Sequence, residues 1–349
     1  MQQLSRTFIV ASLAIASLAV IPTGAAAATS DRSGFGAISA EAVNAEPTAD
    51  DLAADGGPAV LRAQILLDRA NFSPGVLSGR TSSNMRHALF FFQQEHGLPA
   101  TGDLDAATYD ALVARGGRDD AVVRITLSAR DVRGPYRWIP VGVYDQAEFE
   151  CLCYASALEM LNERYHTITA VLTKLNPSIY FGDLAPGMEL WVPNVTPFNV
   201  REPYREGRTR AIAKIIVNKR GRYLQALASD GSIVFHFPTT VGSVADPSPN
   251  GTYSVAAIQW RPVFRYSPGL YSDVPDWRQN AKLPPGPNSP VGIVWIATSR
   301  DHVGIHGTPL PHTIGLASSH GCVRLTNWNA AQLASAVRPG VPIAFVSRG

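Results

Sequence analysis

The stretch Ser319-His320-Gly321-Cys322 constrains the fold more than any other part of the chain. It places a thiol directly after a His-Gly pair, and a second histidine, His306, precedes the thiol by 16 positions. Cysteine attacks carbonyl carbons as the thiolate, so a base must take its proton near neutral pH. The chain between the two motifs must therefore turn back until the side chains meet. We expect His306 to be that base and to hold the pKa of the thiol below that of a free cysteine.

Glycines lie next to both candidate catalytic residues. Gly307 follows His306, and Gly321 precedes Cys322. Glycine accepts positive φ, which favours a tight turn that carries a reactive side chain. Such a turn would let backbone N–H groups near Cys322 converge on a developing oxyanion.

Two other interpretations of these residues stay open. A lone cysteine is usually a small buried hydrophobic residue. Four of the side chains are also of the types that bind zinc: His306, His312, His320 and Cys322. Residue types alone do not separate catalysis from these alternatives.

The two motifs resemble the active-site signature of a known enzyme family. His306-Gly307-Thr308, followed by Ser319 to Leu325 and then Asn327, is similar to the signature of the L,D-transpeptidases, the YkuD or ErfK family. The similarity runs from about Lys214 to Val346 and includes the segments 246–252 and 284–292. The resemblance implies a mainly β catalytic domain, similar to a β-sandwich, over residues 211–349.

The resemblance also implies a reaction on peptidoglycan. Cys322 would form a thioester with a stem tetrapeptide, release D-alanine and pass the acyl group to an amine, as a 3-3 cross-link or a protein attachment. His306 would accept and donate the proton, and the carbonyl of Gly307 would orient it. The backbone at His320 and Gly321 would form the oxyanion hole.

Three further residues of the motif are expected to contact the substrate: Ser319, Arg324 and Asn327. Arg324 suits a substrate carboxylate, because a guanidinium binds that group bidentately, although a structural salt bridge is an equal alternative. No metal and no cofactor is expected. A Cys-dependent L,D-carboxypeptidase or peptidoglycan hydrolase, and a wall-binding protein without enzymatic activity, remain alternatives.

Residues 1–28 have the pattern of a secretory signal. Arg6 supplies the positive charge, an apolar run extends from Phe8 to Ile21, and Ala26-Ala27-Ala28 offers a cleavage site. A spanning helix needs about 20 apolar residues, so we expect no stable membrane span after cleavage. The prediction is an exported protein of the periplasm or cell envelope. Residues 29–57, rich in small and acidic side chains, predict a flexible linker.

Residues 58–115 have helical periodicity. One apolar face is formed by Met85, Ala88, Leu89 and Phe92. Asp105 can cap a third helix. Together with Gly97-Leu98 and Thr101-Gly102, the segment resembles the three-helix peptidoglycan-binding domain, which implies binding to the wall.

The middle of the chain is less regular. Residues 116–145 predict a linker with one strand near Val122 to Leu127. Residues 146–195 resemble a small α+β LysM-like segment, because Leu158, Leu161 and Tyr165 share a helical face and 184–194 resembles its closing strand. The usual opening motif is absent, so glycan binding and a spacer role both stay open.

Charge and cysteine content narrow the possible partners. The net charge of +2 argues against nucleic acid, which needs extensive phosphate neutralisation. Three cysteines in 349 residues do not make a disulfide scaffold. Cys151 and Cys153 are either bridged locally or reduced, and Cys322 is expected to be free. The sequence therefore predicts a multidomain, mainly β protein whose partners are peptidoglycan stem peptides and glycan; it gives no oligomeric state.

Overall fold

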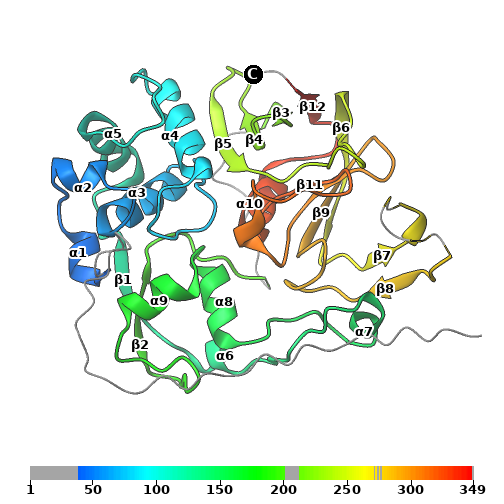
Figure 1. Cartoon of the computed structure of the whole chain (residues 1–349), viewed down its shortest axis with the longest axis horizontal. Coiled ribbons are helices and arrows are strands. Elements are labelled where there is room, and N and C mark those ends of the chain that lie inside the picture. Colours follow the sequence, from blue (N-terminus) through cyan, green and yellow to red (C-terminus); the bar gives the residue numbers. More distant parts are fainter. Residues whose placement is uncertain (1–37, 201–211, 271, 273–274, 276, 348–349) are drawn as a thin grey trace, which may run out of the picture. The chain divides into compact units, whose positions relative to one another are not determined.

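The computed structural model describes residues 38–200, 212–270, 272, 275 and 277–347 (Figure 1). The predicted signal sequence and the first part of the predicted linker at 29–57 lie outside these residues. No helix in the described ranges has the length and apolar character that a membrane crossing requires.

The N-terminal described segment is helical. Its helices are α1 (Ala40–Asn44), α2 (Ala49–Ala53), α3 (Pro58–Arg69), α4 (Ser83–Glu95) and α5 (Ala106–Gly116). The predicted apolar face of α4 is buried, and the carboxylate of Asp105 caps α5 by accepting a hydrogen bond from Thr108 N at 2.7 Å. The flexible-linker prediction is wrong for residues 38–57, because α1 and α2 bury Val43 and Leu52.

A small α+β segment follows. Strands β1 (Val122–Thr126) and β2 (Glu189–Pro193) pair antiparallel. Between them come α6 (Ala129–Val132), α7 (Val143–Ala147), α8 (Ala157–Arg164) and α9 (Thr169–Leu175). The strand predicted near 122–127 is present, but it is the partner of the closing strand and not part of a linker. The segment therefore begins at 122, and the predicted boundary at 146 is corrected. Cys151 and Cys153 form a disulfide, and Cys322 is a free thiol.

The C-terminal segment is built on one eight-stranded sheet. In spatial order its strands are β11 (Val323–Arg324), β10 (Gly304–His306), β9 (Val294–Thr298), β6 (Gly251–Trp260), β12 (Pro342–Val346), β3 (Lys214–Asn218), β4 (Tyr223–Leu227) and β5 (Ile233–Pro238). A separate hairpin consists of β7 (Phe264–Tyr266) and β8 (Ala281–Leu283). The predicted multidomain, mainly β class is confirmed.

Strand β6 joins the two halves of the sheet. Its start pairs with β12 and its end with β9, and a register shift lies between Val255 and Ala257. A bulge of this kind bends a strand and lets it serve two parts of a sheet. Apolar residues from both halves meet in a single core, together with helix α10 (Asn327–Ala336). The resemblance to a sandwich thus arises from one bent sheet.

The helical segment covers the free edge of this sheet at β5. Ser73 N donates to His236 O, and His236 N donates to Asn71 O, each at 2.9 Å. Helix α4 lies beside β5 (Figure 1), where Phe91 contacts the rings of Tyr223 and His236. Pairing satisfies backbone groups that an exposed edge would leave open.

Phe92 and Phe90 of α4 provide a matched test of side-chain burial in the helical segment. Phe92 is fully buried and Phe90 is 38% exposed. Phe92→Ala should lower the free energy of unfolding by about 3–5 kcal/mol, because it leaves a cavity. Phe90→Ala should change it by less than about 1 kcal/mol. Urea denaturation of both variants tests this, and equal losses would contradict the assigned burial.

Candidate active site

The two motifs lie on neighbouring strands. Strands β10 and β11 are parallel, with Ile305 opposite Val323 and His306 opposite Arg324. Side chains alternate between the faces of a strand. Ile305 and Val323 are buried in the core, so His306 and Arg324 share the other face. Cys322 directly precedes β11, two residues before Arg324.

A tryptophan forms part of this face. Trp295 lies opposite His306 on β9, and the two rings stack with centroids 5.4 Å apart. An added Cβ on Gly304 would collide with the indole ring. Gly304 is therefore glycine because the ring of Trp295 passes over its backbone. Sequence reasoning missed Trp295, although it is the outward residue of an alternating strand.

His306 is held as a neutral base. It is 4% exposed, and its Nδ1 lies 2.7 Å from the carbonyl oxygen of Gly307. A carbonyl only accepts, so Nδ1 carries the proton and Nε2 is left as the acceptor. Burial, reinforced by the positive charge of Arg324, lowers the pKa of His306 to about 3, and the Gly307 hydrogen bond only partly opposes this.

The thiol of Cys322 is also held neutral. It donates to the carbonyl oxygen of His302, with Sγ and O 3.5 Å apart. Burial raises the pKa of Cys322, while a backbone hydrogen bond from Gly304 and the charge of Arg324 act against the rise. The expectation that the histidine holds the thiol pKa below its ordinary value is therefore wrong for the resting site, because desolvation dominates both groups.

The loop that carries Cys322 is clamped by the segment 239–248. Thr240 and Arg324 exchange backbone hydrogen bonds of 3.0 and 2.8 Å, and Ser319 N donates to Val241 O at 2.9 Å. Ser248 Oγ donates to Gly321 O at 2.8 Å. Sequence reasoning gave Thr240 and Ser248 no role. Ser248 could have been found from the sequence, because it lies in the segment 246–252 that resembles the transpeptidase family.

Three residues of the motif have defined positions in this loop. Ser319 is buried, and its hydroxyl donates to Cys322 O at 2.5 Å. Gly321 has φ of +103°, a conformation that favours glycine. His320 is exposed, and its Nε2 lies 4.0 Å from a carboxylate oxygen of Asp246. The hydroxyl of Ser319 thus has a partner within the loop, and its predicted contact with the substrate stays a prediction.

Asn327 makes hydrogen bonds within the protein. It is fully buried as the first residue of α10. Its Nδ2 donates to Glu163 Oε1 at 2.7 Å and to Pro287 O at 3.1 Å. These contacts give Asn327 a structural role, and its predicted contact with the substrate stays a prediction.

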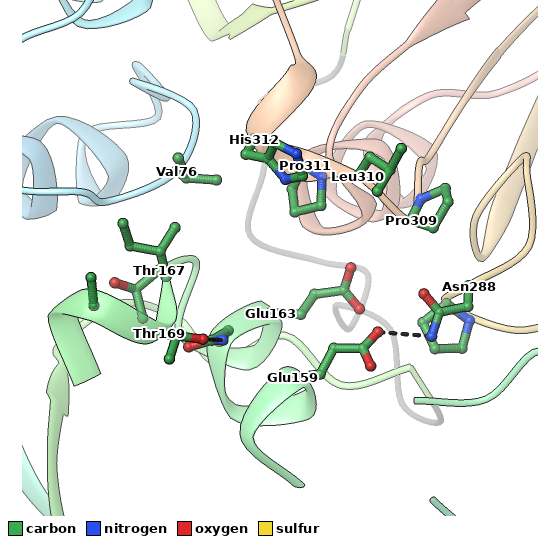
Figure 2. Close-up of a pocket in the computed structure, with 14 residues that line it drawn as sticks. Val76, Glu159, Glu163, Thr167, Thr169, Asn288, Pro309, Leu310, Pro311 and His312 are labelled. Atoms are coloured by element: carbon green, nitrogen blue, oxygen red, sulfur yellow. Dashed lines mark hydrogen bonds between the residues drawn. The ribbon is translucent and has the colours of Figure 1, made fainter. Parts of the chain in front are cut away.

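The residues of the zinc alternative are not gathered in one place. Across residues 38–200 and the described residues from 212 onward, no group of three His, Cys, Asp or Glu side chains could hold a metal ion. His312 instead lines a cavity of about 530 Å³ together with Glu159 and Glu163 (Figure 2).

Arg324 provides a test of the electrostatics. Its positive charge lowers the pKa of both Cys322 and His306. Removing the charge in Arg324→Gln should therefore raise the midpoint of Cys322 alkylation by iodoacetamide, by about one pH unit. Arg338→Gln, at an exposed arginine, is the control and should leave the midpoint unchanged. A midpoint that stays constant or falls in Arg324→Gln would contradict this assignment.

Two parts of this chain match models of known protein families. Residues 212–344 match the family model described as L,D-transpeptidase catalytic domain, and residues 56–112 match the model described as "Putative peptidoglycan binding domain". The first match spans His306 and Cys322.

Several known proteins are similar to this chain, among them two relatives and one solved structure. "Putative L,D-transpeptidase YkuD" of Bacillus licheniformis is 28% identical over 54% of this chain and 92% of the relative. The protein of the same name from Bacillus subtilis is 27% identical over 50% of this chain and 84% of the relative. The solved structure "L,D-transpeptidase from Mycobacterium smegmatis" is 20% identical over 47% of this chain and 75% of that chain, with a TM-score of 0.33.

Proposed function

We propose that this chain, whose residues 212–344 form an L,D-transpeptidase catalytic domain, acts on peptidoglycan with Cys322 as its nucleophile and His306 as its general base. The observation that supports the proposal is the parallel pairing of β10 with β11, the strand that begins directly after Cys322 and that has Arg324 opposite His306. The Nδ1–H of His306 is fixed on a carbonyl, which leaves Nε2 to take a proton.

The first half-reaction forms a thioester. Nε2 of His306 takes the thiol proton as Sγ of Cys322 attacks the carbonyl carbon at the L-centre of a stem tetrapeptide. The resulting oxyanion is bound by backbone N–H groups at His320 and Gly321. When the C–N bond breaks, His306 returns the proton to the leaving amine of D-alanine. Because both groups rest in their neutral forms, the imidazolium exists only during the transfer, and the carbonyl of Gly307 stabilises it.

The second half-reaction forms the cross-link. An amine of a second stem peptide attacks the thioester, His306 takes a proton from that amine, and the sulfur leaves and regains a proton. The product is a new amide bond and a free thiol. We assign Arg324 to a carboxylate of the substrate, since it lies on the same face as His306.

The remaining segments bring this chemistry to the cell wall. Residues 56–112 form a peptidoglycan-binding domain, and we propose that they hold the enzyme on its polymeric substrate. The LysM-like interpretation of the α+β segment gains support from β1, which supplies the opening strand. We propose that it contacts glycan, and that the protein works in the periplasm or cell envelope after export.

The Cys322–His306 pair can be tested with a stem tetrapeptide and mass spectrometry. Cys322→Ala should abolish the thioester adduct. His306→Ala should slow its formation by about 10²–10⁴-fold, because general base catalysis is lost. The double variant should be no worse than Cys322→Ala, since both changes disable one functional unit. His312→Ala, at an exposed histidine, is the control and should keep the activity.

The same experiment separates the alternatives. A cross-linked dimer identifies a transferase, whereas free tripeptide identifies a carboxypeptidase or hydrolase. An adduct in Cys322→Ala, or full activity in His306→Ala, would overturn the assigned pair.

A further inference from the structure

The first turn of α10 is held by residues outside the catalytic domain. Asn327 donates a hydrogen bond to Glu163, the last residue but one of α8. The next residue, Trp328, stacks on His166 with ring centroids 4.9 Å apart and planes 7° from parallel. Asn327 and Trp328 are fully buried. Two consecutive residues, shortly after Cys322 in sequence, are therefore fixed by the α+β segment.

Asn327 also touches the backbone that orients the catalytic base. Its Oδ1 accepts a hydrogen bond from Ile293 N at 3.3 Å. The same oxygen lies so close to Gly307 and Gly292 that an added Cβ on either glycine would collide with it. Gly307 is the residue whose carbonyl holds Nδ1 of His306. The position of the Asn327 side chain therefore limits where this carbonyl can lie.

Glu163 is itself fixed by contacts on both of its carboxyl oxygens. It is buried, and its second carboxyl oxygen is 2.5 Å from the hydroxyl of Tyr154. Figure 2 shows Glu163 and Glu159 projecting from α8 into the cavity, with Pro309–His312 on its other side. Glu159 differs from Glu163 because it binds Asn288 and not Asn327. Only one of these two neighbouring carboxyl groups therefore reaches α10.

We propose that Glu163 is a positioning residue of the active site, acting through Asn327 and Gly307 on the orientation of His306. The α+β segment at 122–195 is then a required part of the catalytic unit as well as a candidate wall-binding module. This inference rests on the proposed function, because it assumes that His306 is the catalytic base.

The hydrogen-bond roles show which substitution should be tolerated. Burial, with a smaller contribution from Glu159, raises the pKa of Glu163 to about 8, while hydrogen bonds from Tyr154 and Asn327 oppose the rise. Burial and the neighbouring Glu163 raise the pKa of Tyr154, while the positive charge of Arg164 opposes the rise. Both carboxyl oxygens accept: Oε1 from Asn327 and Oε2 from the hydroxyl of Tyr154. A glutamine keeps the first bond through its oxygen, and its amide group can donate to the hydroxyl oxygen of Tyr154 in place of the second.

Three variants of the full chain test the proposal: Glu163→Ala, Glu163→Gln and Glu159→Gln. The readouts are kcat and KM for acylation by a stem tetrapeptide, and the NMR signal of the His306 Nδ1 proton. Glu163→Ala should lower kcat by about 10–100-fold with KM changed less than about 3-fold, because a small misplacement of a catalytic group has an effect of this size. Its Nδ1 proton signal should shift or broaden. Glu163→Gln and the control Glu159→Gln should resemble the wild type in both readouts.

Opposite results would overturn the proposal. A wild-type kcat together with an unchanged Nδ1 proton signal in Glu163→Ala would show that Glu163 does not position His306. Equal losses of kcat in Glu163→Gln and Glu163→Ala would show that the hydrogen bonds of residue 163 to Asn327 and Tyr154 do not position His306. If Glu163→Ala does not fold, Glu163→Leu fills part of the same space without a hydrogen-bond acceptor, and the same outcomes apply. A wild-type protein that forms no thioester would instead refute the proposed function, whereas the Nδ1 signal still reports on positioning.

Discussion

The burial of polar groups at the start of α10 is the constraint on which the rest of the structure depends. Buried polar atoms must find partners, because leaving one unpaired costs about 1–3 kcal/mol. Asn327 is satisfied by Glu163 of the α+β segment, and Asn329 Oδ1 accepts from Ser73 of the helical segment at 3.0 Å. Trp328 lies between them, against His166. The first turn of this helix can therefore be buried only when all three segments have assembled around it.

This burial explains the resting state of the catalytic pair. The packing around this pair buries His306 and partly buries Cys322, and desolvation favours the neutral forms of a histidine and a cysteine alike. The site therefore has a fixed geometry, but its resting cysteine is a thiol and not a thiolate. Its chemistry then depends on substrate-driven proton transfer, in which the Gly307 carbonyl holds the imidazole while Nε2 acts.

Local patterns predicted those features that depend on neighbouring residues. The apolar face of α4, the cap at Asp105 and the mainly β class of the C-terminal segment were all accessible from the sequence, and the motif spacing drew attention to His306 and Cys322. Non-local features were not accessible. The pairing of β1 with β2 joins strands that are far apart in the chain, the contact of Asn327 with Glu163 crosses a segment boundary, and both pKa directions depend on desolvation by distant residues. A pattern that reports only local order therefore assigned β1 to a linker and gave no sign of the contact between Asn327 and Glu163.

The glycines around the catalytic pair also depend on contacts with residues that are distant in the sequence. In the sequence they indicate conformational freedom, and at Gly321 the positive φ makes this interpretation correct. At Gly304 and Gly307 the reason is different: the ring of Trp295 and the amide of Asn327 occupy the space that a Cβ would need. These glycines mark close contacts and not flexible points. Because Asn327 is itself held by Glu163 of the α+β segment, the motif is specified by the surrounding packing as well as by its own sequence.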